Sequence, residues 1–474
     1  MIRRYYATKD NSITNAYQEN LVTRGTGSNM GASDILEVFS IYGQQSSASS
    51  ELMRTIIQFD TTELTADRTA GKIPASGSVS WHLKMFNAPH SQTVPSEFNL
   101  IVSAVSGAWE EGYGLDMDFY EDLTRDVIGS NWIRRTGSTS WSSEGGDYYV
   151  APTFTQTFNT GLEDMELDVS ELVEQWIKGT SGGGKDNHGF GVKLPDATET
   201  AARSFFTKKF FGRDSEFFFQ RPVIEARFDN ARRDDRADFF TSSSAAPAED
   251  NLNTLFLYNN IRGKLANIPA IGTNPPLVNL YGTVGTLASK IGNTFTGSHV
   301  STGIYQVEVF ADTVQEEIHD VWSYESVEYF TGSIPTQAVT FNDQKAIYVL
   351  SMPNLRKEYR KDQRHELRLY IREKNWSPNI FTEAIKTSIP TLIVHSASFQ
   401  LRRDIDDYIV VPYGTGSATT SAHTALSYDI SGNYFELDTS YLEEGYLYDV
   451  QYSFFDTDYG WQEQPYRFTF RVVD

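Results

Sequence analysis

The chain has 474 residues, of which 40 are Lys or Arg and 62 are Asp or Glu, so its formal net charge is −22. It contains no cysteine, which excludes disulfides, zinc–thiolate sites, iron–sulfur clusters and thiol catalysis. The excess of negative charge argues against a nucleic-acid partner, because binding to phosphates depends on Lys and Arg. Aromatic residues make up 14% of the chain, which is not the composition of a disordered protein. The length corresponds to roughly two to four domains.

The apolar runs, such as Ile409–Val411, are too short for a transmembrane helix. The N-terminal segment Met1–Tyr6 carries two arginines without an apolar segment after them, so we expect no signal peptide. Together with the missing cysteines, this predicts a protein that folds in a reducing cytoplasm.

Short segments with alternating apolar and polar residues recur along the chain, and clusters of Gly, Ser, Thr, Asn and Asp separate them. Such alternation predicts half-buried β-strands. The clearest segments are 34–39, 79–86, 98–103, 304–310, 365–371 and 466–472. The sequence therefore predicts an all-β protein built from sandwiches or jelly rolls.

One segment between these strands has the pattern of a helix. Asp168 is a candidate N-cap with Glu171 three residues later, and Gly179 follows the last helical position. Four apolar residues between them fall on one helix face, namely Val169, Leu172, Val173 and Trp176. We expect this single short helix to close one end of a sandwich.

The composition changes at two places along the chain. Residues 230–250 are charged and then rich in small side chains, which is typical of a linker. A second, weaker change lies at 332–336. The sequence thus predicts three domains, which comprise residues 1–232, 240–337 and 338–474.

Six segments of the first domain follow one another in the order of a known family. They are 29–38 (N-x-G-x-S), 54–60 (R-x-x-x-x-F-D), 109–112 (W-x-E-G), 168–176 (D-V-x-x-x-V-x-x-W), 188–194 and 221–226 (R-P). Residues 29–228 therefore resemble the disaggregatase-related (DNRLRE) domain, a jelly-roll family related in shape to carbohydrate-binding modules. The resemblance implies a jelly roll with Trp109, Trp141 and Trp176 as core anchors. Long insertions at 115–137 and 182–186 depart from the family pattern, so the resemblance extends to the fold and not to a ligand site.

The rest of the chain carries two further resemblances. Segments 432–438 (F-x-L-D) and 442–448 (L-x-x-G-x-x-Y) resemble half of an immunoglobulin-like sandwich. They imply that the jelly roll is followed by two smaller immunoglobulin-like β-sandwich domains. Residues 240–474 as a whole, rather than any single motif, resemble virion structural proteins of tailed bacteriophages.

The segments that resemble catalytic or metal-binding motifs lack the preceding strand or the ligand spacing that such sites require. Residues 179–186 come close to a P-loop and contain G-x-S-x-G, but they follow the predicted helix rather than a strand. The acidic cluster in 116–122 lacks the spacing of an EF-hand, and His365 lacks a second histidine four residues later. We therefore expect no enzyme, no catalytic residue, no cofactor and no metal site.

Aromatic residues in the insertions of the first domain are the remaining candidates for a site. They are Tyr113, Tyr120, Trp132, Tyr148 and Tyr149. Such residues stack on sugars, anchor contacts between subunits, or fill a core, and the sequence leaves these three alternatives open.

These observations predict a non-enzymatic structural component of a tailed-bacteriophage virion, in the neck, tail or capsid exterior, that acts through subunit–subunit packing. Its partners would be other virion structural proteins and copies of itself, with no nucleic acid and no membrane. It would be made in the host cytoplasm and located in the virion. The alternative is a carbohydrate-binding adhesin or receptor-binding protein with a glycan partner. A polysaccharide-degrading enzyme is a third alternative, which would require a cleft with two carboxylates about 5–9.5 Å apart.

Overall fold

The computed structural model describes most of the chain, namely residues 1–18, 20–42, 50–90, 94–115, 129–244, 247–282, 290–312, 317–335, 347–374, 391–414, 422–457 and 459–474. These residues form two compact units, an N-terminal unit built from Ile2–Asp229 and a C-terminal unit built from Asn230–Gly416 and Thr424–Asp474. The division into three domains at 232–240 and 337 remains a prediction. None of the described helices has the length and apolar character needed to cross a bilayer.

The N-terminal unit is a two-sheet sandwich. Its strands are β1 (Ile2–Thr14), β2 (Ile35–Tyr42), β3 (Ser50–Phe59), β4 (Ser80–Met85), β5 (Phe98–Val105), β6 (Tyr148–Phe158), β7 (Met165–Asp168), β8 (Phe190–Lys193), β9 (Phe205–Phe211) and β10 (Val223–Arg227). The first half of β1 pairs with β10, which continues to β4 and β7. The second half pairs with β3, which continues to β8, β5 and β6, while β2 and β9 extend the same sheet. A register shift between Ala7 and Lys9 lets β1 pass from one sheet to the other, as strands do at the corners of sandwiches.

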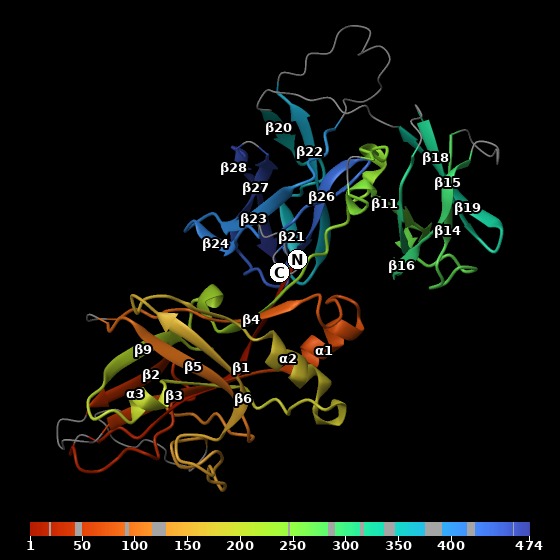
Figure 1. The fold of residues 1–474 in the computed structure, drawn as a ribbon. Coiled ribbons are helices and arrows are strands. Elements are labelled where there is room, and N and C mark those ends of the chain that lie inside the picture. The colour runs from red at the N-terminus through yellow and green to blue at the C-terminus, as the bar shows by residue number, and fades with distance from the viewer. Residues whose placement is uncertain are drawn as a thin grey trace. The chain divides into compact units, whose positions relative to one another are not determined.

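The predicted helix is present as α2 (Ser170–Lys178), which begins after Val169 and ends at Gly179, a residue with a positive φ. Its apolar stripe is buried, and Trp176 packs edge-on against Phe190 at 4.7 Å between ring centroids. A second helix, α1 (Thr61–Thr69), was not predicted, because Leu64 is its only large apolar residue. Figure 1 shows α1 and α2 side by side next to β4. A single turn, α3 (Asp196–Glu199), follows β8.

The C-terminal unit contains two further sandwiches (Figure 1). The first of them, the middle sandwich, consists of β11 (Asn253–Tyr258), β14 (Leu277–Tyr281), β15 (Lys290–Thr296), β16 (Ser298–Ser301), β17 (Ile304–Val309), β18 (Glu317–Tyr324) and β19 (Val327–Pro335), with a small hairpin of β12 (Asn260–Ile261) and β13 (Lys264–Leu265). One sheet has the order β11-β17-β16 and the other β15-β14-β18-β19. Trp322, Tyr305 and Phe239 lie in the core between them. In immunoglobulin terms these orders correspond to strands B-E-D and C′-C-F-G.

The C-terminal sandwich consists of β20 (Tyr348–Ser351), β21 (Glu358–Arg360), β22 (Arg364–Glu373), β23 (Ala397–Arg403), β24 (Tyr408–Val411), β25 (Ser427–Asp429), β26 (Gly432–Asp438), β27 (Leu447–Asp456), β28 (Gly460–Glu463) and β29 (Phe468–Val473). One sheet has the order β20-β22-β26-β25, which is the A-B-E-D order of an immunoglobulin domain. The other has the order β21-β29-β27-β23-β24, which contains the G-F-C order. The predicted fold class is therefore confirmed as all-β, with immunoglobulin-like sandwiches after the first domain.

The linker predicted at 230–250 is corrected at its beginning. Asp234, Arg236 and Phe239 are all buried, and residues 235–237 form a 3-10 turn. The charges that suggested a solvated linker are paired inside the C-terminal unit, because Arg236 contacts both Asp234 and Asp320.

Candidate functional site

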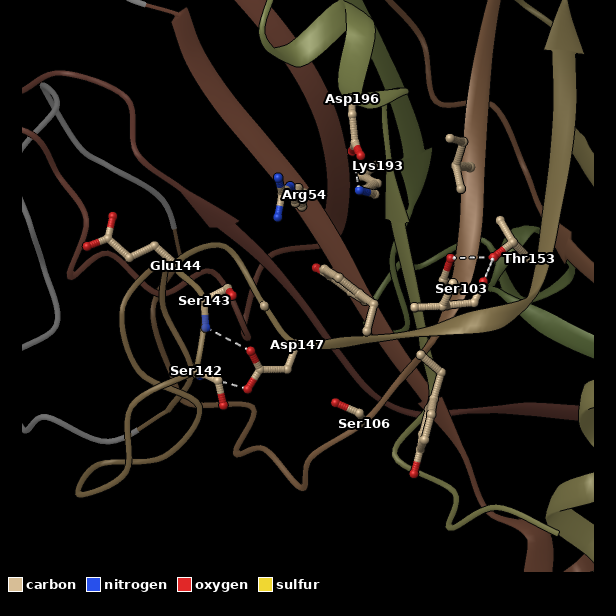
Figure 2. Close-up of a pocket in the computed structure, with 15 residues that line it drawn as sticks. Arg54, Ser103, Ser106, Ser142, Ser143, Glu144, Asp147, Thr153, Lys193 and Asp196 are labelled. Atoms are coloured by element: carbon tan, nitrogen blue, oxygen red, sulfur yellow. Dashed lines mark hydrogen bonds and ion pairs between the residues drawn. The ribbon is translucent and has the colours of Figure 1, made fainter.

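A polar pocket of about 720 Å³ lies on the N-terminal unit, between the loop that precedes β6 and residues of β5, β6 and β8. It is lined by Arg54, Ile101, Ser103, Ser106, Ser142, Ser143, Glu144, Gly146, Asp147, Tyr148, Tyr149, Val150, Thr153, Lys193 and Asp196. Figure 2 shows Lys193 and Asp196 on one side of the pocket and the loop from Ser142 to Asp147 on another. Hydroxyl groups are the most frequent polar groups of this lining.

Arg54 lies in β3, and three hydrogen bonds fix its guanidinium group. Its Nε and Nη2 donate to the two carboxylate oxygens of Glu199 at 3.1 and 2.6 Å, and Nη1 donates to the carbonyl oxygen of Gly145 at 2.8 Å. The guanidinium also lies 5.0 Å from the ring centroid of Trp132. A nearly buried arginine held by two carboxylate oxygens and a ring has one orientation, so it forms a fixed part of the wall.

Tyr148 lines the pocket and packs closely on glycines. A Cβ at Gly191 would come within 2.0 Å of the Tyr148 ring, so only glycine fits there. The Tyr148 hydroxyl donates to the carbonyl oxygen of Gly145 at 2.8 Å. Burial raises the pKa of Tyr148 to about 12, so its hydroxyl stays protonated at neutral pH.

The loop before β6 is fixed by Asp147. Its two carboxylate oxygens accept the backbone N–H groups of Ser142 and Ser143 at 2.8 and 2.9 Å, and its carbonyl oxygen accepts the N–H of Ser106. This loop therefore presents its serine hydroxyls from a defined backbone.

Two lysines lie near the tyrosine rings of the pocket, and one of them, Lys193, belongs to the lining. Lys193 pairs with Asp196 at 2.5 Å and lies 6.0 Å from the ring centroid of Tyr148. Lys185 lies 5.3 Å from the ring centroid of Tyr149. The pocket combines hydroxyls, an amphipathic ring and fixed charges, which is the chemistry of binding a polar ligand.

Two of the predicted site residues, Tyr148 and Tyr149, line this pocket. Trp132 is buried beside Trp109 and Trp141, with Tyr148 packed against the same cluster, so it belongs to the core rather than to a surface platform. Tyr113 is 82% exposed and is not part of the pocket lining. Tyr120 lies outside the described residues.

Sequence reasoning missed Arg54 and Lys193 as parts of a site. A signal was present for Arg54, because it is a charged residue beside Met53 and shortly before the apolar pair Ile56 and Ile57 in β3. Lys193 had no such signal, because only the pairing of β8 with β3 and β5 brings it to the pocket.

A second feature that the sequence did not reveal is an aromatic surface on the C-terminal sandwich. Phe455 and Trp461 pair across β27 and β28 with ring centroids 5.6 Å apart, and they are 45% and 37% exposed. Tyr459, in the turn between these strands, is 57% exposed. These three residues are called the hairpin patch below.

The structure describes two of the rejected motifs, residues 179–186 and His365. Residues 179–186 follow α2, and Thr180–Gly182 form a 3-10 turn. His365 lies within β22. Among the residues that the structure describes, no three acidic or histidine side chains gather to hold a metal ion. The acidic cluster of 116–122 lies outside the described residues.

No family model matches the chain, and no curated protein matches it. Solved structures similar to it include a chimeric titin Z1Z2 tandem, with 10% identity, 49% of this chain and 92% of that chain covered, and a TM-score of 0.15. The Yersinia pseudotuberculosis adhesin InvE has 11% identity, with 49% of this chain and 57% of that chain covered and a TM-score of 0.16. The Salmonella alpha-2-macroglobulin has 7% identity, with 100% of this chain and 28% of that chain covered and a TM-score of 0.16. At such scores, the fold assignment rests on the strand pairing and not on these similarities.

Proposed function

We propose that the chain is a non-enzymatic structural component of a tailed-bacteriophage virion and acts by packing its β-sandwiches against neighbouring subunits. The hairpin patch carries this proposal. Large exposed aromatic side chains are the preferred anchors of protein interfaces. In the described part of the chain, β28 pairs with β27 alone, so its outer edge offers backbone N–H and C=O groups next to these rings.

The net charge and the resemblance of residues 240–474 support the virion as the location. A net charge of −22 disfavours contact with packaged DNA, which suits the neck, the tail or the capsid exterior. The similarity of residues 240–474 to virion structural proteins points to the same kind of particle. The chain would be made in the host cytoplasm and would contact copies of itself and other virion proteins.

Mass spectrometry of purified particles tests the location, with the chain expected at a fixed stoichiometry. Its absence from the particles would contradict the virion role. The packing role is tested with the double variant Phe455→Ser/Trp461→Ser, which should fold normally but fail to enter particles. Ile405→Ser is the matched control, because Ile405 is 76% exposed on another turn of the same sandwich. Normal incorporation of the double variant would rule out the hairpin patch as the interface.

The pocket of the N-terminal unit favours a second candidate function, binding of a glycan by an adhesin or receptor-binding protein. A sugar presents hydroxyl groups and an apolar face, which match the serine hydroxyls and the ring of Tyr149. A glycan array should then show saturable binding that Tyr149→Ala abolishes and Tyr113→Ala leaves unchanged, since Tyr113 is exposed outside the pocket. An array without binding, or equal loss in both variants, would count against this function.

A further inference from the structure

Residues 232–238 lie at the junction of the middle and C-terminal sandwiches. Two neighbouring domains move relative to each other unless the contacts between them are buried and extensive. Here Asp234 and Arg236 are 6% and 8% exposed, although both carry a charge. Such burial requires partners, and the partners come from both sandwiches.

On one side, the segment adds to the C-terminal sandwich as a short parallel strand. Arg233 forms a β-bridge with Tyr428 of β25. The N–H of Tyr428 donates to the carbonyl oxygen of Arg232 at 2.9 Å, and the N–H of Asp234 donates to the carbonyl oxygen of Tyr428 at 3.1 Å. The N–H of Arg232 donates to the hydroxyl of Ser427 at 2.9 Å. The free edge of β25 is therefore paired by the segment.

On the other side, Arg236 fixes the segment to the middle sandwich. Its Nη2 donates to Asp320 of β18 at 2.6 Å, and its Nη1 donates to Asp234 at 2.7 Å and to the carbonyl oxygen of Phe256 at 2.5 Å. Asp320 also accepts the indole N–H of Trp322 at 2.7 Å. Buried charge pairs of this kind tolerate little displacement, because separation leaves a charge unpaired.

Asp235 joins the two sets of contacts. Its Oδ1 accepts the hydroxyl of Tyr428 at 2.8 Å, and its Oδ2 accepts the N–H of Thr254, at the start of β11, at 2.6 Å. One carboxylate thus bonds to both sandwiches at once. At the end of the segment, Asp238 accepts His395 Nε2 at 2.5 Å, and the His395 ring packs edge-on against Tyr428.

We propose that residues 232–238 act as a clasp that holds the two immunoglobulin-like sandwiches as one rigid pair, with Asp235 as the residue that both sandwiches share. This inference does not depend on the particle role, because it concerns contacts within a single chain. It predicts that the pair keeps one relative orientation in solution instead of moving about a linker.

Distance measurement between two spin labels tests the clasp. The chain has no cysteine, so Glu308→Cys in β17 and Thr469→Cys in β29, both exposed, provide two unique labelling sites in the full chain. The labelled parent should give one narrow distance distribution. Tyr428→Phe and Asp235→Ala should widen it at least about twofold, toward the spread of a flexibly joined pair. Tyr459→Phe is the control, because it removes an exposed tyrosine hydroxyl from the same sandwich.

A broad distribution in the parent would overturn the proposal, and so would a distribution that stays narrow in both clasp variants. Hydrogen exchange of the unmodified chain provides a second reading that does not depend on the variants. The amides of Asp234 and Tyr428 should exchange as slowly as those of β27, since they are bonded in the clasp. Exchange at the rate of an exposed loop would also overturn the proposal.

Discussion

The hydroxyl of Tyr448 donates a hydrogen bond to the backbone carbonyl oxygen of Glu443 at 2.7 Å, across the turn that leads into β27. Tyr448 is fully buried near the start of this strand, which occupies the F position of the C-terminal sandwich. This is the arrangement of the tyrosine corner in immunoglobulin-like domains. It gives a structural role to the L-x-x-G-x-x-Y pattern at 442–448.

We predict that Tyr448→Phe destabilises the C-terminal sandwich by about 1 kcal/mol, because it removes the hydrogen bond between the buried side chain and the carbonyl of Glu443. The measurement is the free energy of opening from hydrogen exchange of β26 and β27 in the full chain. Tyr459→Phe should leave exchange in these strands unchanged, since Tyr459 is exposed. An unchanged value for Tyr448→Phe would show that the hydrogen bond contributes little.

The ion pair of Arg54 and Glu199 supports the wall of the pocket, and both side chains are nearly buried. We expect Glu199→Gln to cost about 3 kcal/mol of stability, because it leaves the guanidinium buried without its countercharge. Thermal and urea unfolding of the N-terminal unit within the full chain would measure this loss. Asp196→Asn is the control, since the partner of Lys193 is 80% exposed and a surface pair contributes at most about 1 kcal/mol. Equal losses in the two variants would contradict this prediction.

Asp10 makes the stability of the N-terminal unit depend on pH. Burial raises the pKa of Asp10 to about 7, opposed by Arg213, while Glu111 and Asp214 raise it further. The unfolded chain releases this proton near pH 4, so the folded state binds more protons between about pH 4 and 7. The stability from this group is therefore complete below about pH 4 and is lost as the pH rises through 7, by at most about 4 kcal/mol.

Asp10→Asn removes the titration but keeps an oxygen that can accept the N–H of Arg213, which Asp10 now accepts at 2.5 Å. The difference in unfolding free energy between the variant and the parent should grow in favour of the variant from pH 4 to pH 7.5. Urea titrations across this range measure it. A difference that does not change with pH would exclude Asp10 as the titrating group.

Lys208 is a fully buried cation with three oxygen acceptors. Its Nζ donates to Asn87 Oδ1, the carbonyl oxygen of Gly161 and the carbonyl oxygen of Glu163 at 2.7, 2.9 and 2.7 Å. Lys208→Met should cost about 3 kcal/mol, because it leaves one buried and two partly buried acceptors unpaired. The adjacent Lys209→Met is a matched control, as Lys209 lies on the opposite face and pairs with Glu37 only at 3.6 Å. Urea unfolding of both variants distinguishes them, and a stable Lys208→Met would refute the prediction.

Features that depend on neighbours in the chain could be predicted from the sequence. The strands at 34–39, 98–103 and 365–371 are present as β2, β5 and β22, because alternation of buried and exposed side chains is a local property. The predicted helix is present as α2 for the same reason. In contrast, α1 has too few apolar residues to form a stripe, and it folds with Leu64 and Asp67 buried in the N-terminal unit.

The sites depend on residues that are far apart in the chain. Arg54 and Glu199 are separated by 145 positions, and Asp235 and Tyr428 by 193. Their side chains meet only because particular strands pair, and no local pattern records which strands those are. The same applies to Asp234 and Arg236, which a local pattern assigns to a solvated linker and which distant partners bury.

The sequence by itself determined the fold class, the local elements and the chemistry that a chain without cysteine excludes. The charge of −22 and the aromatic content are sums over residues, so they needed no coordinates. Only the tertiary structure decided which tyrosines line a pocket, which tryptophan belongs to the core and which charges form a clasp. The physical reason is that burial and pairing of a side chain are set by its neighbours in space, and strand order brings these neighbours together from distant parts of the chain.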